Sequence, residues 1–166
     1  MFLLICINGE VNCQKKFNGY SINPKLGVFG PFSGGGSAAI GGAEFYLIRN
    51  KLTLGLDFYH GMWNWNGDVE ESLNQFNFMD GIFFETKSSV FRFLIQGGIG
   101  ILKSTYKSGQ NEGWTKYTLG VPLDVEIKCI PTKYFSVGID LQVNMNTEYP
   151  IYMIMASVEF GKLKHP

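Results

Sequence analysis

Residues 116–129 read KYTLGVPLDVEIKC, and apolar or aromatic side chains occupy every second position from Tyr117 to Cys129. The positions between them are polar, glycine or proline, and they include Asp124 and Glu126. A repeat of two residues is the pattern of a β-strand with one apolar and one polar face. Residues 134–144 continue this alternation without a break in phase. The C-terminal part of the chain therefore predicts antiparallel hairpins.

The pattern extends outward from this stretch to most of the chain. The strand segments expected from alternation and from turn residues number eight: residues 25–32, 38–48, 52–59, 76–87, 90–102, 116–129, 134–144 and 151–160. The phase is clearest in residues 52–59 and 90–102 and in the last three segments, and blurred in the other three. Eight consecutive strands predict an all-β, up-and-down antiparallel barrel.

The connections between these segments alternate in length. Residues 49–51, 87–89 and 131–133 are tight turns, whereas residues 63–75 and 107–113 are long and polar. Outer-membrane barrels have short periplasmic turns and longer extracellular loops. The sequence therefore favours a transmembrane barrel whose long loops, 63–75 and 107–113, could meet an extracellular ligand or partner protein.

Composition sets limits on the class of protein. The chain has 166 residues, enough for a single barrel domain, and its 14 basic residues balance 14 acidic ones. A nucleic-acid partner is not expected, because no basic excess is present to attract one. Charged residues make up 17% of the chain, below the roughly 25% of soluble domains. The longest apolar run, residues 1–7, is far shorter than the ~20 residues of a membrane-spanning helix, so any crossing must use a closed barrel.

The N-terminal residues predict export. Residues 1–13 resemble the apolar and cleavage regions of a secretory signal without its basic start, and residues 14–166 would then form one barrel domain. A frayed N-terminal extension is the alternative interpretation of residues 1–13. Loss of the signal would leave Cys129 without an internal disulfide partner.

Alternation alone does not say which face points inward, so the residues on each face must decide. The polar phase combines glycines with charged side chains, which suits the narrow interior of an eight-stranded barrel. The apolar phase of the five clearest segments carries no Lys or Arg between its ends, as a bilayer would require, because a lipid-facing cation costs ~2–4 kcal/mol. A soluble lipid-binding calyx would have the opposite polarity. We expect an ion-pair network in the lumen, with Arg92 as its hub, made of Asp57, Arg92, Asp124, Glu126, Lys128, Asp140 and Glu159.

Aromatic residues collect near the strand ends. Such residues are typical of the two headgroup interfaces of a membrane protein. Exposed tryptophans in residues 63–67 could also stack on a sugar or anchor a partner, although interface anchoring is the more common role. The interface aromatics that we expect are Trp63, Trp65, Trp114, Tyr149, Phe135 and Phe160.

The chain resembles the small eight-stranded bacterial outer-membrane barrels, such as the transmembrane domain of outer membrane protein A and outer membrane protein X. The resemblance covers roughly residues 21–163 and includes the turn Pro131-Thr132-Lys133 before residues 134–138, YFSVG, and a closing strand with Phe160 near its end. Phe160 is followed by residues 161–166, whereas the family usually ends on its aromatic residue, and Pro122 lies inside a strand, where it predicts a bulge.

The resemblance implies a porin-like protein in the outer membrane of a Gram-negative bacterium, in contact with membrane lipid and lipopolysaccharide. It also implies a non-enzymatic role in envelope structure or surface recognition, with a lumen plugged by side chains. No cofactor is expected.

Few residues suggest chemistry, and each has a simpler explanation. His60 near Asp57 could belong to a lipid-modifying barrel enzyme, as in a few barrels of this family, but no serine lies beside it in the sequence. Asp68, Glu70 and Glu71 could bind a divalent cation, but they lack the spacing of a dedicated calcium loop. We therefore predict no catalytic residue and no metal site.

Overall fold

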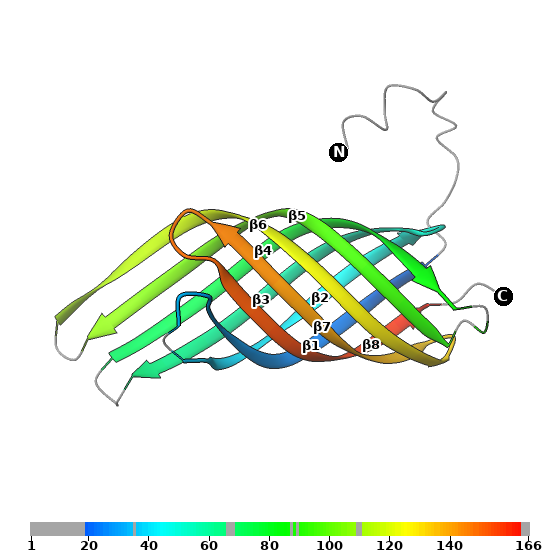
Figure 1. Cartoon of the computed structure of the whole chain (residues 1–166), viewed down its shortest axis with the longest axis horizontal. Helices are drawn as coiled ribbons and strands as arrows, with labels where there is room; N and C mark the ends of the chain where they lie inside the picture. Colours follow the sequence, from blue (N-terminus) through cyan, green and yellow to red (C-terminus); the bar gives the residue numbers. More distant parts are fainter. Residues whose placement is uncertain are drawn as a thin grey trace, which may run out of the picture.

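A computed structural model describes residues 19–34, 36–65, 69–86, 88, 90–108 and 111–163. It forms a closed barrel in which each strand pairs antiparallel with the next and β8 pairs with β1 (Figure 1). Among the described residues, no helix is long and apolar enough to cross a membrane. The strands are β1 (Gly19–Pro31), β2 (Ala38–Arg49), β3 (Leu52–Trp65), β4 (Val69–Glu85), β5 (Phe91–Ser108), β6 (Asn111–Thr132), β7 (Phe135–Asn146) and β8 (Ile151–Lys162).

The predicted eight-stranded up-and-down barrel is confirmed, but two predicted loops are wrong. Residues 63–75 and 107–113 are mostly strand, because β3 runs to Trp65, β4 starts at Val69, β5 ends at Ser108 and β6 starts at Asn111. Residues 66–68 and 109–110 lie outside the described part of the chain. The regular alternation of apolar and polar residues is lost along these hairpin ends, so the pattern that predicts strands stops before the strands do.

Strand register departs from expectation at one residue. Pro122 predicted a bulge, yet Gly97 pairs with Leu123 and Gly100 with Gly120, so the β5–β6 register does not shift across it. The irregularities in β6 lie at its two ends instead, next to Ser108 of β5 and next to Thr132. A proline that removes one ladder hydrogen bond is therefore accommodated without an inserted residue.

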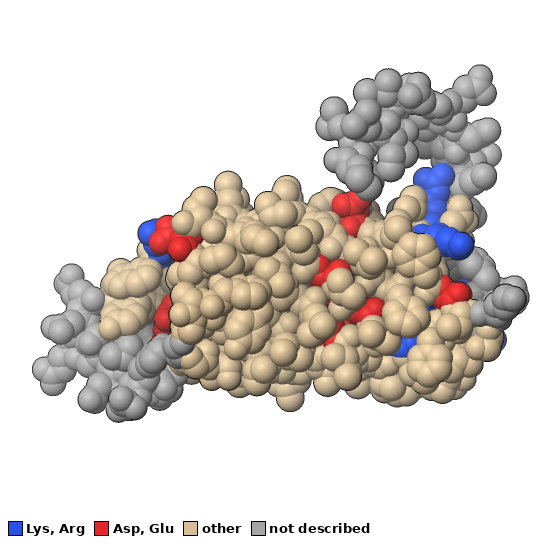
Figure 2. Space-filling view, viewed as in Figure 1, with Lys and Arg blue, Asp and Glu red and all other residues tan. Residues whose placement is uncertain are grey.

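The apolar side chains point outward and the polar ones inward. Val137, Ile139 and Leu141 are 41%, 60% and 52% exposed, whereas Asp140 and Gln142 on the alternate positions of the same strand are 0% and 1% exposed. Lys and Arg are visible only toward the two ends of the face that Figure 2 shows. A soluble calyx requires the reverse arrangement, so that alternative is incompatible with the structure.

The interior of the barrel has three layers. A large apolar cluster fills the end near the long hairpins, with Trp63 and Phe29 packed edge to face at a centroid distance of 5.5 Å. A smaller cluster around Phe83 and Leu94 lies near the short turns. Most of the buried charged side chains lie between them, on the middle parts of the strands. This arrangement encloses a charged chamber between two apolar layers.

Candidate functional site

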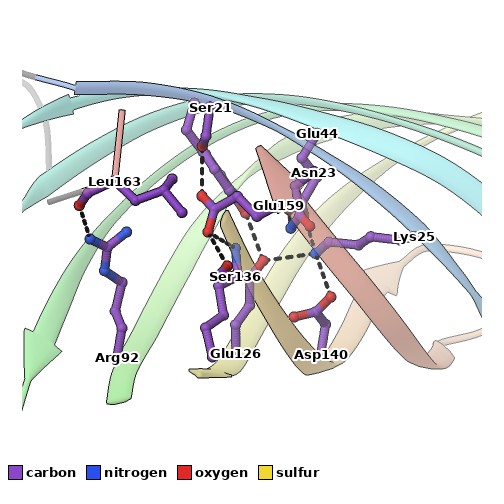
Figure 3. A network of polar contacts seen from close by, with 12 residues as sticks. Ser21, Asn23, Lys25, Glu44, Arg92, Glu126, Ser136, Asp140, Glu159 and Leu163 are labelled. Carbon is purple, nitrogen blue, oxygen red and sulfur yellow. Dashed lines mark hydrogen bonds and ion pairs between the residues drawn. The ribbon is translucent and has the colours of Figure 1, made fainter. Parts of the chain in front are cut away.

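Lys25 of β1 is the centre of the charged chamber. Its Nζ lies 2.5 Å from Glu44 Oε1, 2.7 Å from Glu126 Oε1, 3.2 Å from Asp140 Oδ2 and 3.7 Å from Asp124 Oδ2 (Figure 3). All five side chains are buried. They come from β1, β2, β6 and β7, so only closure of the barrel brings them together.

A second lysine extends the network toward the short turns. Lys128 Nζ lies 2.6 Å from Glu126 Oε2 and 3.4 Å from Glu159 Oε2. The hydroxyl groups of Ser21 and Ser136 donate to the two oxygens of Glu159 at 2.6 and 2.8 Å. Glu126 therefore bridges both ammonium groups, and hydroxyl donors complete the far end of the network.

Two buried tyrosines join the carboxyl groups on the other side of the chamber. Tyr59 Oη donates to Glu44 Oε1 at 2.6 Å, and Tyr46 Oη lies within hydrogen-bond distance of both Glu44 and Glu126. Gln96 Nε2 donates to Tyr46 Oη at 2.7 Å. The phenol groups therefore link the acids into one connected network that crosses the barrel.

Carboxyl groups outnumber the ammonium groups in this chamber. Neither oxygen of Asp124 accepts a hydrogen bond from the described residues, although Asp124 is only 1% exposed. Burial of a large uncompensated charge is strongly unfavourable, so protons or small cations must offset part of the negative charge. The acids are Glu44, Asp57, Asp124, Glu126, Asp140 and Glu159, and the ammonium groups are those of Lys25 and Lys128.

Three of the acids have the spacing of a metal site. Carboxylate oxygens of Glu44, Asp124 and Glu126 all lie within 4.8 Å of one another. Lys25 Nζ, however, lies within 2.7 Å of oxygens of Glu44 and Glu126. The ammonium group of the protein itself thus takes the position that a metal ion would need, and the geometry describes an internal ion-pair cluster.

The structure places all seven predicted lumen residues inside the barrel, but the predicted hub is wrong. Arg92 lies at the end with the short turns, where it donates to Glu85 Oε1 at 3.0 and 2.7 Å and to the carbonyl oxygen of Leu163 at 2.5 Å. Its guanidinium also covers the ring of Phe83 at 4.4 Å. The pairing of β4 with β5 sets Arg92 opposite Glu85, so Arg92 forms its ion pair with this neighbouring carboxylate.

The sequence pattern did not predict Lys25 and Glu44 as members of the network, because the apolar alternation is blurred in residues 25–32 and 38–48. The signal is nevertheless present in residues 20–26, where Ser21, Asn23 and Lys25 alternate with Tyr20 and Ile22. Burial alternates in the same way along β1. A strand assigned from Gly19 would have placed Lys25 on the inward face.

The predicted interface aromatics divide between the two faces. Trp63 is 9% exposed and belongs to the interior apolar cluster, so its predicted place at the membrane interface is wrong. Its position follows from the unexpected length of β3, which continues the inward phase of Tyr59. The side chain of Trp65 lies outside the described part of the structure. Trp114 is 49% exposed and stacks on Tyr106 at a centroid distance of 5.7 Å.

The remaining aromatics lie near the two ends of the barrel. Phe160 is 49% exposed and packs against the half-buried Phe135 at 5.5 Å, near the short turns. Tyr149, between β7 and β8, is half-buried and donates to Glu71 Oε1 at 2.9 Å. Burial raises the pKa of the Tyr149 phenol. Tyr149 therefore ties the β7–β8 connection to β4.

The residues considered for chemistry are not assembled into a site. His60 is exposed, with Nδ1 2.9 Å from Asn74 Oδ1, whereas Asp57 is buried in the interior. Asp68 and the side chain of Glu70 lie outside the described part of the structure. The proximity of His60 and Asp57 in the sequence does not place them on the same face.

The chain was compared with known families, sequences and structures. No family profile and no curated protein sequence matches it. Its structure is similar to Neisserial surface protein A, with a TM-score of 0.72 and 9% identity over 86% of this chain and 96% of that chain. It is similar to Ail, the attachment invasion locus protein of Yersinia pestis, with a TM-score of 0.63 and 9% identity over the same shares of the two chains.

Ail has been solved in further structures, and a third neighbour is an enzyme. Ail is an outer membrane protein and has also been solved in complex with the heparin analogue sucrose octasulfate. The outer membrane enzyme PagL matches with a TM-score of 0.53 and 13% identity over 84% of this chain and 98% of that chain. Identities this low establish the fold alone. This chain therefore has the fold of the small eight-stranded outer-membrane β-barrels.

Proposed function

We propose that this protein is a non-enzymatic β-barrel of the bacterial outer membrane, in contact with membrane lipid and lipopolysaccharide. The observation that carries the proposal is the division of faces: apolar side chains such as Ile139 and Leu119 are 60% and 74% exposed, while Lys25 and Glu126 are 4% and 0% exposed. In water this arrangement would expose a continuous apolar belt, whereas in a bilayer it is the stable one.

Outer-membrane fractionation tests the location. The full-length protein should partition with the outer membrane and require detergent for extraction. It should also migrate differently in electrophoresis before and after boiling, because a closed barrel resists unfolding by detergent alone. A soluble protein with a single mobility would overturn the proposal.

We further propose that the lumen is plugged and carries no open pore. Support comes from the ion pairs of Lys25 and Lys128 across the chamber and from the apolar clusters at its two ends. Eight strands leave an interior just wide enough for side chains. Purified protein in a planar lipid bilayer should therefore show no sustained conductance, and stable open channels would contradict a plugged lumen.

The long hairpins are the part that we propose to act in surface recognition or envelope contacts. The β3–β4 and β5–β6 hairpins extend beyond the β7–β8 connection (Figure 1), and β5–β6 carries the exposed Trp114. Support comes from Ail, a structural neighbour that has been solved in complex with the heparin analogue sucrose octasulfate.

Cysteine labelling on intact cells tests which end is outside. In a cysteine-free variant, Thr115→Cys on the β5–β6 hairpin should react with a membrane-impermeant maleimide, and Thr132→Cys at a short turn should not. Both residues are exposed in the structure, so a difference in labelling would reflect the side of the membrane and not burial within the protein. The reverse labelling pattern would show that the long hairpins face the periplasm.

The likeness to PagL keeps an enzymatic function as a second candidate. His60 is the residue that would carry it, and Asn74 is its hydrogen-bond partner in the structure. Cells with wild-type protein and cells with His60→Ala should have the same lipid composition. A lipid species that depends on His60 would instead establish an enzyme.

A further inference from the structure

The barrel wall changes height between β6 and β7. Pairing between these strands ends at Gly120 and Asn146, so residues 111–119 of β6 rise beyond the last residue of β7. Figure 1 shows the β5–β6 hairpin extending past the β7–β8 connection. A groove with a volume of about 470 Å³ lies at the foot of this step. The groove therefore lies where β6 continues without β7 as its partner.

The groove is apolar and opens to the outside of the barrel. It contains Ile99 of β5, Leu119 and Val121 of β6, and Met145 of β7, which are 70%, 74%, 50% and 54% exposed. Pro150 of the β7–β8 connection closes one side. Among the described residues, none that lines the groove is charged. The groove is therefore continuous with the lipid-facing surface of the proposed membrane protein.

An ion pair supports the upper edge of the groove. Lys116 Nζ lies 2.7 Å from Glu148 Oε2, which joins the extended part of β6 to the β7–β8 connection. This contact spans the step where strand pairing is missing. It therefore links the two edges of the groove.

A cation and aromatic rings lie just above the groove. Lys103 pairs with Tyr117, two residues along each strand from the pair Ile101 and Leu119, which corresponds to ~7 Å. Lys103 Nζ lies 5.9 Å from the centre of the Tyr117 ring. Aromatic and basic residues at this depth are typical of the headgroup interface. Along the strands, the cation and the aromatic ring lie above the apolar groove. This order matches a lipid whose anionic headgroup lies above its acyl chain.

We propose that this groove binds one acyl chain of lipid A, the phosphorylated lipid part of lipopolysaccharide, with its phosphate near Lys103. The proposal rests on the proposed location in the outer membrane. The long-hairpin end of such a barrel faces the leaflet that contains lipopolysaccharide, so lipid A is the occupant that this position favours over a phospholipid.

Lipid retention measured by native mass spectrometry tests the proposal. Full-length protein is reconstituted with equal amounts of lipid A and phosphatidylglycerol and then extracted in mild detergent. Wild type should retain one lipid A molecule. Met145→Trp, which fills the groove without adding charge, should reduce that retention at least tenfold. Leu141→Trp adds the same side chain on the lipid-facing side of β7, outside the groove, and should retain lipid A as wild type does.

The outcomes separate this proposal from the location on which it rests. Equal retention by the two tryptophan variants, no retention by wild type, or preference for phosphatidylglycerol would overturn the lipid A site. Lys103→Gln should lower retention of lipid A about tenfold but leave retention of a dephosphorylated lipid A unchanged; equal loss of both would refute the phosphate contact. A barrel that is heat-modifiable and fractionates with the outer membrane but retains no lipid refutes only the groove.

Discussion

Replacement of Lys25 by methionine should destabilise the barrel more than any other change of a single charge. The substitution keeps the length of the side chain but removes the ammonium group that lies within 4.0 Å of four carboxylates. Loss of one partner from a buried ion pair costs ~3–5 kcal/mol. Because Glu44, Asp124 and Asp140 lose the ammonium group beside them and Glu126 keeps only Lys128, we expect a loss of ~5 kcal/mol in the free energy of unfolding.

Urea unfolding of the protein in lipid vesicles, followed by tryptophan fluorescence, measures this loss. Lys133→Met removes a cation from an exposed turn and should change the free energy of unfolding by less than ~0.5 kcal/mol. The double variant Lys25→Met with Glu126→Gln should recover part of the loss, because it also removes a carboxylate. The loss should shrink as pH falls, since protonated carboxyl groups need no counter-ion. A Lys25→Met variant within 1 kcal/mol of wild type at neutral pH would refute the central role of Lys25.

Three further predictions follow from packing and from one phenol. A Cβ at Gly42 would lie 2.2 Å from the backbone oxygen of Phe58, whereas the nearest atom to a Cβ at Gly41 would be 3.6 Å away. Gly42→Ala should therefore lower the free energy of unfolding, measured in urea, by ~1–3 kcal/mol, and Gly41→Ala should lower it far less. Trp63→Ala should cost ~3–5 kcal/mol, because the side chain fills the interior cluster, and an effect near zero would place it at the surface. The raised pKa of Tyr149 means that the folded state favours the neutral phenol. The contribution of the Tyr149 phenol to stability is fully present below the ordinary pKa of about 10 and is lost as pH rises through its raised pKa in the folded state. Above pH ~10, the urea midpoint of unfolding should therefore fall less steeply in Tyr149→Phe than in wild type.

In the charged chamber, the sequence predicted which side chains point inward but not which of them pair. The inward direction of Asp124, Glu126 and Asp140 followed from alternation, because neighbouring side chains of a strand point to opposite faces whatever the strand pairs with. The partners of these acids did not follow, since Lys25 reaches them only when β1 closes against β8 and the strands acquire their register. For the same reason, the inward direction of Arg92 was predicted correctly but its partner, Glu85, was not.

The sequence by itself determined the strand class, the number of strands and the outward direction of the apolar face, because each depends on a local repeat of two residues and on which side chains suit a narrow barrel interior. Tertiary structure decided the length of the hairpins, the interior position of Trp63 and the centre of the ion-pair network. Those features depend on strand register and on closure of the barrel, which bring together residues such as Lys25 and Glu126 that are far apart in the chain.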